Sequence, residues 1–178
     1  MVRCFIGIMI PGEIRKRVIS LQNELRALPM RCKFVEPDNL HISLSFLGEI
    51  SENEVERISN KLDVICNGFK PFQAYVAGLR TIPSKSYFRV LALDVKSDGI
   101  EKLSKDVKRK IGGSVHPPHL TLCRVKSVEK KEDVIKWVEE RKNVDIGSFV
   151  VSDVKLVKSE LSRSGPRYTV LHESKFRP

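Results

Sequence analysis

The chain has 178 residues, 41% of them hydrophobic, and its 32 Lys and Arg residues against 22 Asp and Glu residues give a formal net charge of +10. This length and composition exclude a disordered chain and allow one large core or two small ones. The positive charge favours a polyanionic partner such as nucleic acid, although many lysines lie on helical patterns, where a solvated helix face explains them more simply. No apolar run approaches the length of a membrane span, and the N-terminal stretch lacks the features of a signal peptide, so we expect a cytoplasmic protein without a membrane partner.

The first half of the chain predicts alternating strands and helices. Apolar runs or alternating apolar residues indicate the strands, and apolar residues spaced three and four apart indicate the helices. We expect Pro11 to open the first helix, a capping box at 51–54 to open the second, and Gly48 to end the strand before it. The predicted elements are a strand at 2–10, a helix from Pro11 to before Pro29, strands at 33–35 and 40–47 around a turn at 37–39, and a helix from 51 to near Gly68.

The second half predicts an antiparallel hairpin followed by further helices and strands. The predicted elements are strands at 72–82 and 87–95, a helix from Asp98 to Gly112, a strand at 120–125, a helix at 132–142, and strands at 149–161 and 168–172. A constrained stretch at 114–118 leads into the strand at 120–125, and a basic, flexible loop at 162–167 joins the last two strands. No low-complexity linker divides the chain, so we expect one domain over residues 1–178.

A four-residue pattern occurs twice, as His41-Ile42-Ser43-Leu44 and as His119-Leu120-Thr121-Leu122. The period of two in a strand places each histidine and its hydroxyl residue on one face, and the aliphatic residues on the other. The two histidines lie 78 residues apart, and a helix follows each strand, which indicates a diverged internal duplication. We therefore predict an α+β fold with two pseudo-symmetric lobes of antiparallel sheet and outer helices around a central cleft, with one motif in each lobe.

The two motifs suit acid–base chemistry on a phosphate. An unperturbed imidazole pKa of about 6.5 leaves both protonation states available near neutrality. Ser43 and Thr121 would bind the non-bridging phosphate oxygens, and Arg124 would stabilise the charge that develops on them. Strict alternation places Arg124 on the face opposite His119, so a bulge would have to turn it into the cleft. A lone histidine on a strand is more often a surface or core residue, but the repeated pattern favours catalysis.

The cysteines and histidines predict neither a metal nor another cofactor. Cys4, Cys32, Cys66 and Cys123 are widely and irregularly spaced, without a Cys-x-x-Cys pair. The two repeated histidines also lack a nearby carboxylate at a spacing that is typical of metal ligands. We therefore expect a metal-independent reaction.

The sequence resembles the RNA 2′,3′-cyclic phosphodiesterases, also called 2′-5′ RNA ligases. The resemblance lies in the opening strand, in the segments around the two motifs at 34–49 and 118–125, and in the closing segments at 156–161 and 165–168. This family belongs to the two-histidine phosphoesterase superfamily. The resemblance implies a bilobal fold, His41 and His119 as the catalytic pair, Ser43 and Thr121 as phosphate ligands, and Arg124 as a further anion contact. It also implies that His41 is the acid for the leaving 3′-oxygen and His119 the base, an assignment that the nearly symmetric motifs leave open.

The activity implied by the resemblance is hydrolysis of a 2′,3′-cyclic phosphate at an RNA 3′ end to a 2′-phosphate. Attack by the 5′-hydroxyl of another RNA, in place of water, would form a 2′-5′ linkage without ATP. Two alternatives remain open: a non-catalytic module that binds a nucleotide or an RNA end, and a phosphodiesterase for small cyclic nucleotides. We expect a monomer in each case.

Contacts with the RNA beyond its terminal phosphate are predicted from two groups of residues. Arg163 and Arg167 lie in the basic loop and could contact a phosphate chain, although an ordinary exposed turn explains them equally well. The aromatic residues that could stack on a base, with core packing as the alternative, are Phe5, Phe46, Tyr87 and Tyr168.

Overall fold

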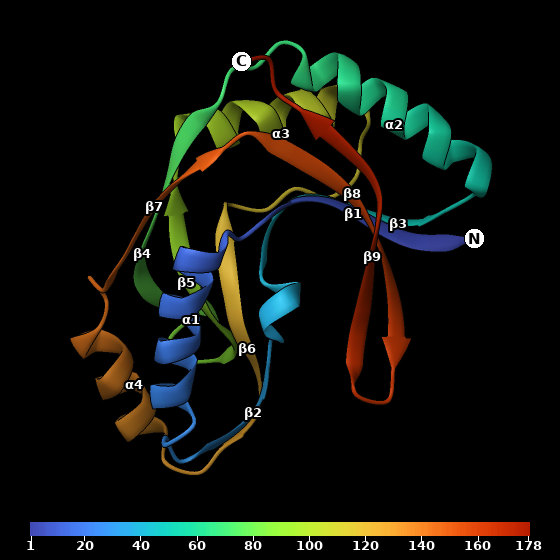
Figure 1. Ribbon diagram of the computed structural model, residues 1–178. Coiled ribbons are helices and arrows are strands. Elements are labelled where there is room, and N and C mark those ends of the chain that lie inside the picture. The colour runs from blue at the N-terminus through green and yellow to red at the C-terminus, as the bar shows by residue number, and fades with distance from the viewer.

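The computed structural model describes residues 1–178 and contains nine strands and four α-helices (Figure 1). The strands are β1 (Val2–Met9), β2 (Met30–Phe34), β3 (His41–Ile50), β4 (Phe72–Pro83), β5 (Phe88–Lys96), β6 (His119–Val128), β7 (Asp145–Val151), β8 (Asp153–Ser162) and β9 (Gly165–Lys175). The helices are α1 (Gly12–Leu25), α2 (Glu52–Cys66), α3 (Asp98–Lys110) and α4 (Lys131–Glu140), and a 3-10 turn spans Pro37–Asn39. None of these helices combines the length and the apolar character that a membrane crossing requires.

The strands form one antiparallel sheet that bends into two lobes. The strand order is β7-β4-β5-β6-β3-β1-β8-β9, and β2 adds a further pair with β6. Helices α2 and α3 lie together over one lobe, and α1 and α4 flank the other (Figure 1). The predicted α+β fold with two lobes of antiparallel sheet and outer helices is confirmed. The strands that carry the two motifs, β3 and β6, are neighbours at the junction of the lobes.

The helices form where the sequence predicts them because each has one apolar face. In α1, the buried positions include Ile14, Val18, Leu21 and Leu25, at the spacings that define an amphipathic helix. Helix α2 begins with the predicted capping box, in which the side chains of Ser51 and Glu54 each accept a hydrogen bond from the other residue's backbone N–H. The local pattern thus predicts where each helix lies, and burial of its apolar face stabilises it.

Several predicted strand boundaries are wrong; β2, for example, begins at Met30 and not at residue 33, and β6 continues to Val128. Gly48 does not end β3: it adopts φ 73° inside the strand, beside a shift in the β1–β3 register, and pairing continues to Ile50. The segment predicted as one strand at 149–161 is two strands, because β7 pairs with β4 whereas β8 pairs with β1 and β9. The loop predicted at 162–167 is a tight turn, since β8 ends at Ser162 and β9 begins at Gly165.

Candidate active site

The two motifs lie on one face of the central strand pair. Ile42 of β3 pairs with Leu120 of β6, and both side chains are 0% exposed on the core side. The side chains on the opposite face, which are half-buried, are His41, Ser43, His119 and Thr121. These four side chains line a single cleft with a volume of about 430 Å³. The strand period therefore brings the residues of both motifs together, as the sequence predicts.

A bulge in β6 turns Arg124 into the same cleft. The β5–β6 register shifts between the Leu91–Cys123 and Ala92–Thr121 pairs, so Leu122 is the extra residue. Leu122 and Cys123 are consequently both 0% exposed, and the alternation of faces reverses after them. Arg124 is exposed and lines the cleft. Regular alternation alone would have placed this guanidinium on the wrong face.

The first motif contains the same bulge at the equivalent position. The β1–β3 register shifts between the Ile6–Ser45 and Gly7–Ser43 pairs, and Leu44 and Ser45 are both buried. Phe46 therefore occupies in β3 the position that Arg124 occupies in β6, and it also lines the cleft. The sequence predicts Phe46 only as one of several aromatic candidates. The signal that singles it out is its spacing, since Phe46 follows His41 by five residues, as Arg124 follows His119.

Both imidazole rings are held by backbone carbonyls of the residue two positions earlier. His41 Nδ1 lies 2.7 Å from the carbonyl oxygen of Asn39, and His119 Nδ1 lies 2.8 Å from that of Pro117. Because a carbonyl oxygen only accepts, each Nδ1 carries the hydrogen in this arrangement. This leaves Nε2 of each ring for proton transfer, and Nε2 of His41 lies 3.0 Å from Ser43 Oγ.

The surroundings of His41 favour its neutral form. Burial lowers the pKa of His41, and the nearby His119 and Arg124 lower it further, while the hydrogen bond to Asn39 opposes these effects. The Phe5 and Tyr168 rings lie 4.6 Å and 5.4 Å from the His41 ring, between centroids. Aromatic packing thus excludes water from one side of the imidazole.

The depressed pKa of His41 predicts a loss of stability in acid. Below the ordinary histidine pKa of about 6.5, the unfolded chain binds a proton at this residue, whereas the folded protein does not until the pH reaches the lower folded pKa. The free energy of unfolding should therefore fall as the pH is lowered through this interval. Urea unfolding at pH 7.5 and 5.5 should show a smaller fall for His41→Asn than for the parent protein. His116→Asn, which removes an exposed imidazole, is the control, and equal falls in all three proteins would contradict the prediction.

Phe5 and Tyr168 both line the cleft, but they differ in exposure. Phe5 is 4% exposed, so it packs against His41 and Tyr168 and leaves little of its ring for a base. Tyr168 is half-buried, and burial raises the pKa of its phenol while the charge of Arg124 opposes the rise. Tyr168 is accordingly the better placed of the two for contact with a substrate.

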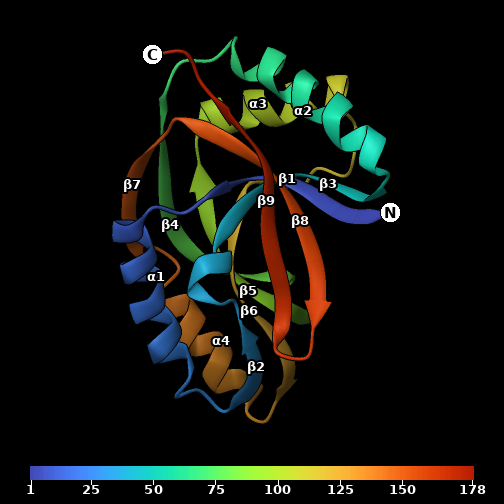
Figure 2. The same cartoon turned by 45° about the vertical axis from the view of Figure 1, so that its right-hand side comes forward.

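The β8–β9 hairpin extends away from helices α2 and α3 (Figures 1 and 2). Residues of both of its strands, including Ser159 and Tyr168, line the cleft. The tip of the hairpin is tied to the opposite wall, because Asn39 Nδ2 donates a hydrogen bond of 2.8 Å to the Pro166 carbonyl. Arg163 and Arg167 are exposed on this hairpin and do not line the cleft, so their contact with RNA stays a prediction. Sequence reasoning missed two other cations that do line it, Arg3 and Lys33.

The charge of the cleft favours an anionic ligand. Its lining contains the side chains of three cations, Arg3, Lys33 and Arg124, against one carboxylate, Glu36. No group of three or more His, Cys, Asp or Glu side chains lies in an arrangement that could hold a metal ion. The cleft therefore brings together two imidazoles, two hydroxyls and a guanidinium.

Comparison with known proteins gives matches over nearly the whole chain. The family model for LigT-like phosphoesterases matches the chain twice, at residues 8–92 and 93–168. Each matched segment contains one of the two motifs, in agreement with an internal repeat. The chain is 32% identical over 178 residues to a protein of Methanothermobacter thermautotrophicus named RNA 2′,3′-cyclic phosphodiesterase, covering 94% of this chain and 95% of that relative. A protein of the same name from Aquifex aeolicus is 32% identical over 183 residues, with 97% and 96% covered.

Solved structures show the same architecture. A crystal structure of a Thermus thermophilus protein superposes with a TM-score of 0.86 and 26% identity, covering 98% of each chain. The crystal structure of E. coli LigT complexed with phosphate gives a TM-score of 0.75 at 23% identity, covering 99% of this chain and 98% of that chain. At that identity, the second likeness establishes the fold alone.

Proposed function

Because the chain belongs to the LigT-like phosphoesterase family, we propose that it hydrolyses 2′,3′-cyclic phosphates at RNA 3′ ends to 2′-phosphates. The observation that carries this proposal is the placement of His41 and His119 in one cleft, each with Nδ1 held by a carbonyl. The names of the relatives from Methanothermobacter and Aquifex support the choice of substrate. A module that only binds RNA ends would need no such pair of proton-transfer groups.

The proposed reaction is an in-line displacement on phosphorus. One imidazole takes a proton from a water molecule as its oxygen bonds to phosphorus, and the other gives a proton to the 3′-oxygen as the P–O3′ bond breaks. Ser43, Thr121 and Arg124 bind the non-bridging oxygens and stabilise the charge that accumulates on them in the transition state. The product keeps the phosphate on the 2′-oxygen.

In this proposal, His41 is the acid and His119 is the base, as the family resemblance implies. The lowered pKa of His41 means that the free protein holds this imidazole mainly neutral. An anionic phosphate bound beside the ring favours its charged form, so the pKa of His41 rises when substrate binds. Substrate binding thereby supplies the protonated imidazole that the leaving 3′-oxygen requires.

The same cleft would also support ligation. A 5′-hydroxyl of a second RNA would replace water as the nucleophile, and its oxygen would bond to phosphorus as the P–O3′ bond breaks. The product would be a 2′-5′ linkage with a free 3′-hydroxyl, and no ATP would be consumed. Water and the 5′-hydroxyl would use the same base, His119.

Hydrolysis is expected to persist in excess chelator. The two imidazoles carry out both proton transfers, so the proposed reaction requires no metal-bound hydroxide or Lewis acid. Initial rates on a 2′,3′-cyclic mononucleotide should agree within about twofold before and after dialysis against EDTA, a change too small to represent the loss of a catalytic metal. Loss of activity in EDTA, restored by one divalent metal and not by others, would contradict the mechanism.

A further inference from the structure

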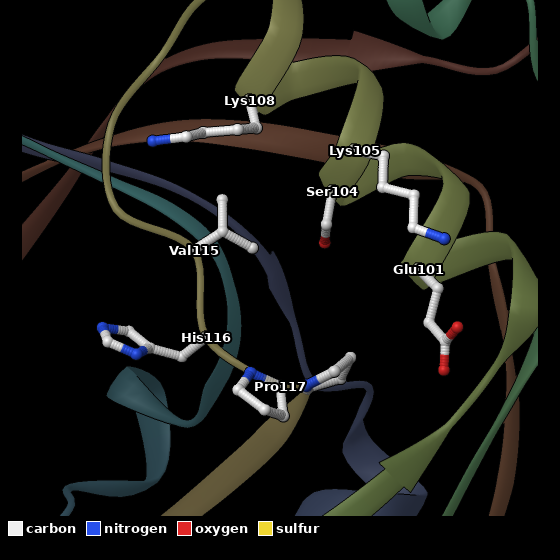
Figure 3. A pocket seen from close by; sticks show the side chains of 8 residues that line it. Glu101, Ser104, Lys105, Lys108, Val115, His116 and Pro117 are labelled. Atoms are coloured by element: carbon white, nitrogen blue, oxygen red, sulfur yellow. The ribbon is translucent and has the colours of Figure 1, made fainter.

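A second cavity lies beside the cleft, between helix α3 and the stretch at 115–118 that leads into β6. Its volume is about 390 Å³, which is within the range of small-molecule sites. Figure 3 shows the side chains that line it, which come from these two segments alone. No residue of the two histidine motifs takes part, so the cavity is distinct from the cleft.

The walls of this cavity are largely hydrocarbon. Val115, Pro117 and Pro118 line one side, and Ser104 of α3 lies on the other. Ser104 is 6% exposed, and its hydroxyl points into the cavity (Figure 3). Buried serines inside helices commonly bond to the carbonyl four residues back, as Ser59 Oγ of α2 does with Val55 at 2.8 Å. Ser104 Oγ makes no hydrogen bond within the protein and is therefore available to a ligand.

The rim of the cavity is cationic. Lys105 and Lys108 stand on the α3 side, with one carboxylate, Glu101. Arg109 of α3 pairs with Asp106, whereas neither Lys105 nor Glu101 belongs to an ion pair. Lys108 donates to the Gly113 carbonyl and keeps further N–H donors free. Flat apolar walls with a cationic rim suit a nucleotide, whose base or ribose packs on hydrocarbon and whose phosphate binds ammonium groups.

The two cavities share a wall. The Phe46 ring lines the cleft, and its centroid lies 6.0 Å from that of His116, which belongs to the second cavity. His116 is three residues before His119, so about 10 Å of extended chain at most separates them. Hydrogen bonds of 2.9 Å in both directions between the backbones of Phe46 and Ser114 fix this wall to β3. A short nucleotide chain can therefore cross the wall from one cavity to the other.

We propose that this cavity binds the nucleotide that immediately precedes the terminal nucleotide of the RNA. The inference rests on the proposed function, which places the terminal cyclic phosphate between His41 and His119. The RNA chain leaves the cleft past Phe46 and His116. The preceding nucleotide then packs against Pro117 and Pro118, and the phosphate that joins it to the terminal nucleotide lies near Lys105.

Product binding tests this subsite without requiring turnover. The probes are a mononucleotide 2′-phosphate and a dinucleotide that ends in the same 2′-phosphorylated nucleotide, with dissociation constants measured by calorimetry. The parent protein should bind the dinucleotide about tenfold more tightly, as expected for one added charge-assisted contact. Lys105→Glu and Ser104→Leu, which reverse the rim charge and fill the cavity, should reduce this ratio to near one. Lys110→Glu makes the same charge change on α3 outside the cavity and should keep the ratio.

Equal affinities of the two probes for the parent protein would overturn the subsite, as would an equal effect of the Lys105 and Lys110 substitutions. Thermal unfolding of Ser104→Leu checks that the variant is folded, and Lys105→Glu changes only an exposed side chain. Failure to hydrolyse any cyclic phosphate would contradict the proposed function instead. The affinity ratio would still decide the subsite in that case.

Discussion

His41→Ala and His119→Ala are each expected to lower kcat on a 2′,3′-cyclic mononucleotide by about two to four orders of magnitude, the usual contribution of a general acid or base. The double variant should lose little more than either single variant, because removing one proton-transfer group already interrupts the reaction. Stopped assays that separate the cyclic substrate from the 2′-phosphate would measure all three rates. A single variant with near-normal turnover would show that the repeated motif is not the catalytic site.

A substrate with sulfur in place of the bridging 3′-oxygen separates the two roles. A thiolate leaves without prior protonation, so this substrate should restore much of the activity of the variant that lacks the acid, which we expect to be His41→Ala. His119→Ala lacks the base and should remain impaired. If the sulfur substrate restored His119→Ala and not His41→Ala, then His119 would be the acid and His41 the base. Folding should be retained in both variants, since the buried partners of these strands, Ile42 and Leu120, lie on the other face.

Arg124→Ala should produce the second largest loss, about 10²- to 10³-fold in kcat, comparable with removal of one donor that stabilises transition-state charge. Arg124→Lys should recover only part of the rate, because an ammonium keeps the charge but loses the planar pair of donors. The control is Arg163→Ala, which removes an exposed guanidinium outside the cleft. Equal rates for Arg124→Ala and Arg163→Ala would show that Arg124 does not stabilise the phosphate in the transition state.

Local sequence patterns account for most of the fold and for the paired motifs. Alternation predicted the faces of His41, Ser43, His119 and Thr121, because these residues precede any irregularity in their strands. Arg124 and Phe46 lie beyond the bulges, where one extra residue reverses the alternation. A bulge depends on how neighbouring strands pair, and that pairing leaves no mark in the composition of the strand itself.

The other differences also arise from tertiary pairing. An apolar alternation continues through 149–161, yet the chain changes sheet partners between Val151 and Asp153. Arg3 and Lys33 reach the cleft because β1 and β2 flank the motif strands, a proximity that sequence separation conceals. The cavity beside α3 was missed because it depends on how closely that helix approaches Pro117 and Pro118.

Identification of the product formed from an oligoribonucleotide with a 2′,3′-cyclic phosphate end tests the central claim most directly. Phosphorus NMR, or digestion followed by chromatography against both isomers, distinguishes a 2′-phosphate from a 3′-phosphate. The proposed mechanism predicts a 2′-phosphate from the parent protein in the presence of EDTA, and almost none from the variant that lacks both His41 and His119. A 3′-phosphate product, or an unchanged cyclic end after prolonged incubation with the parent protein, would contradict it.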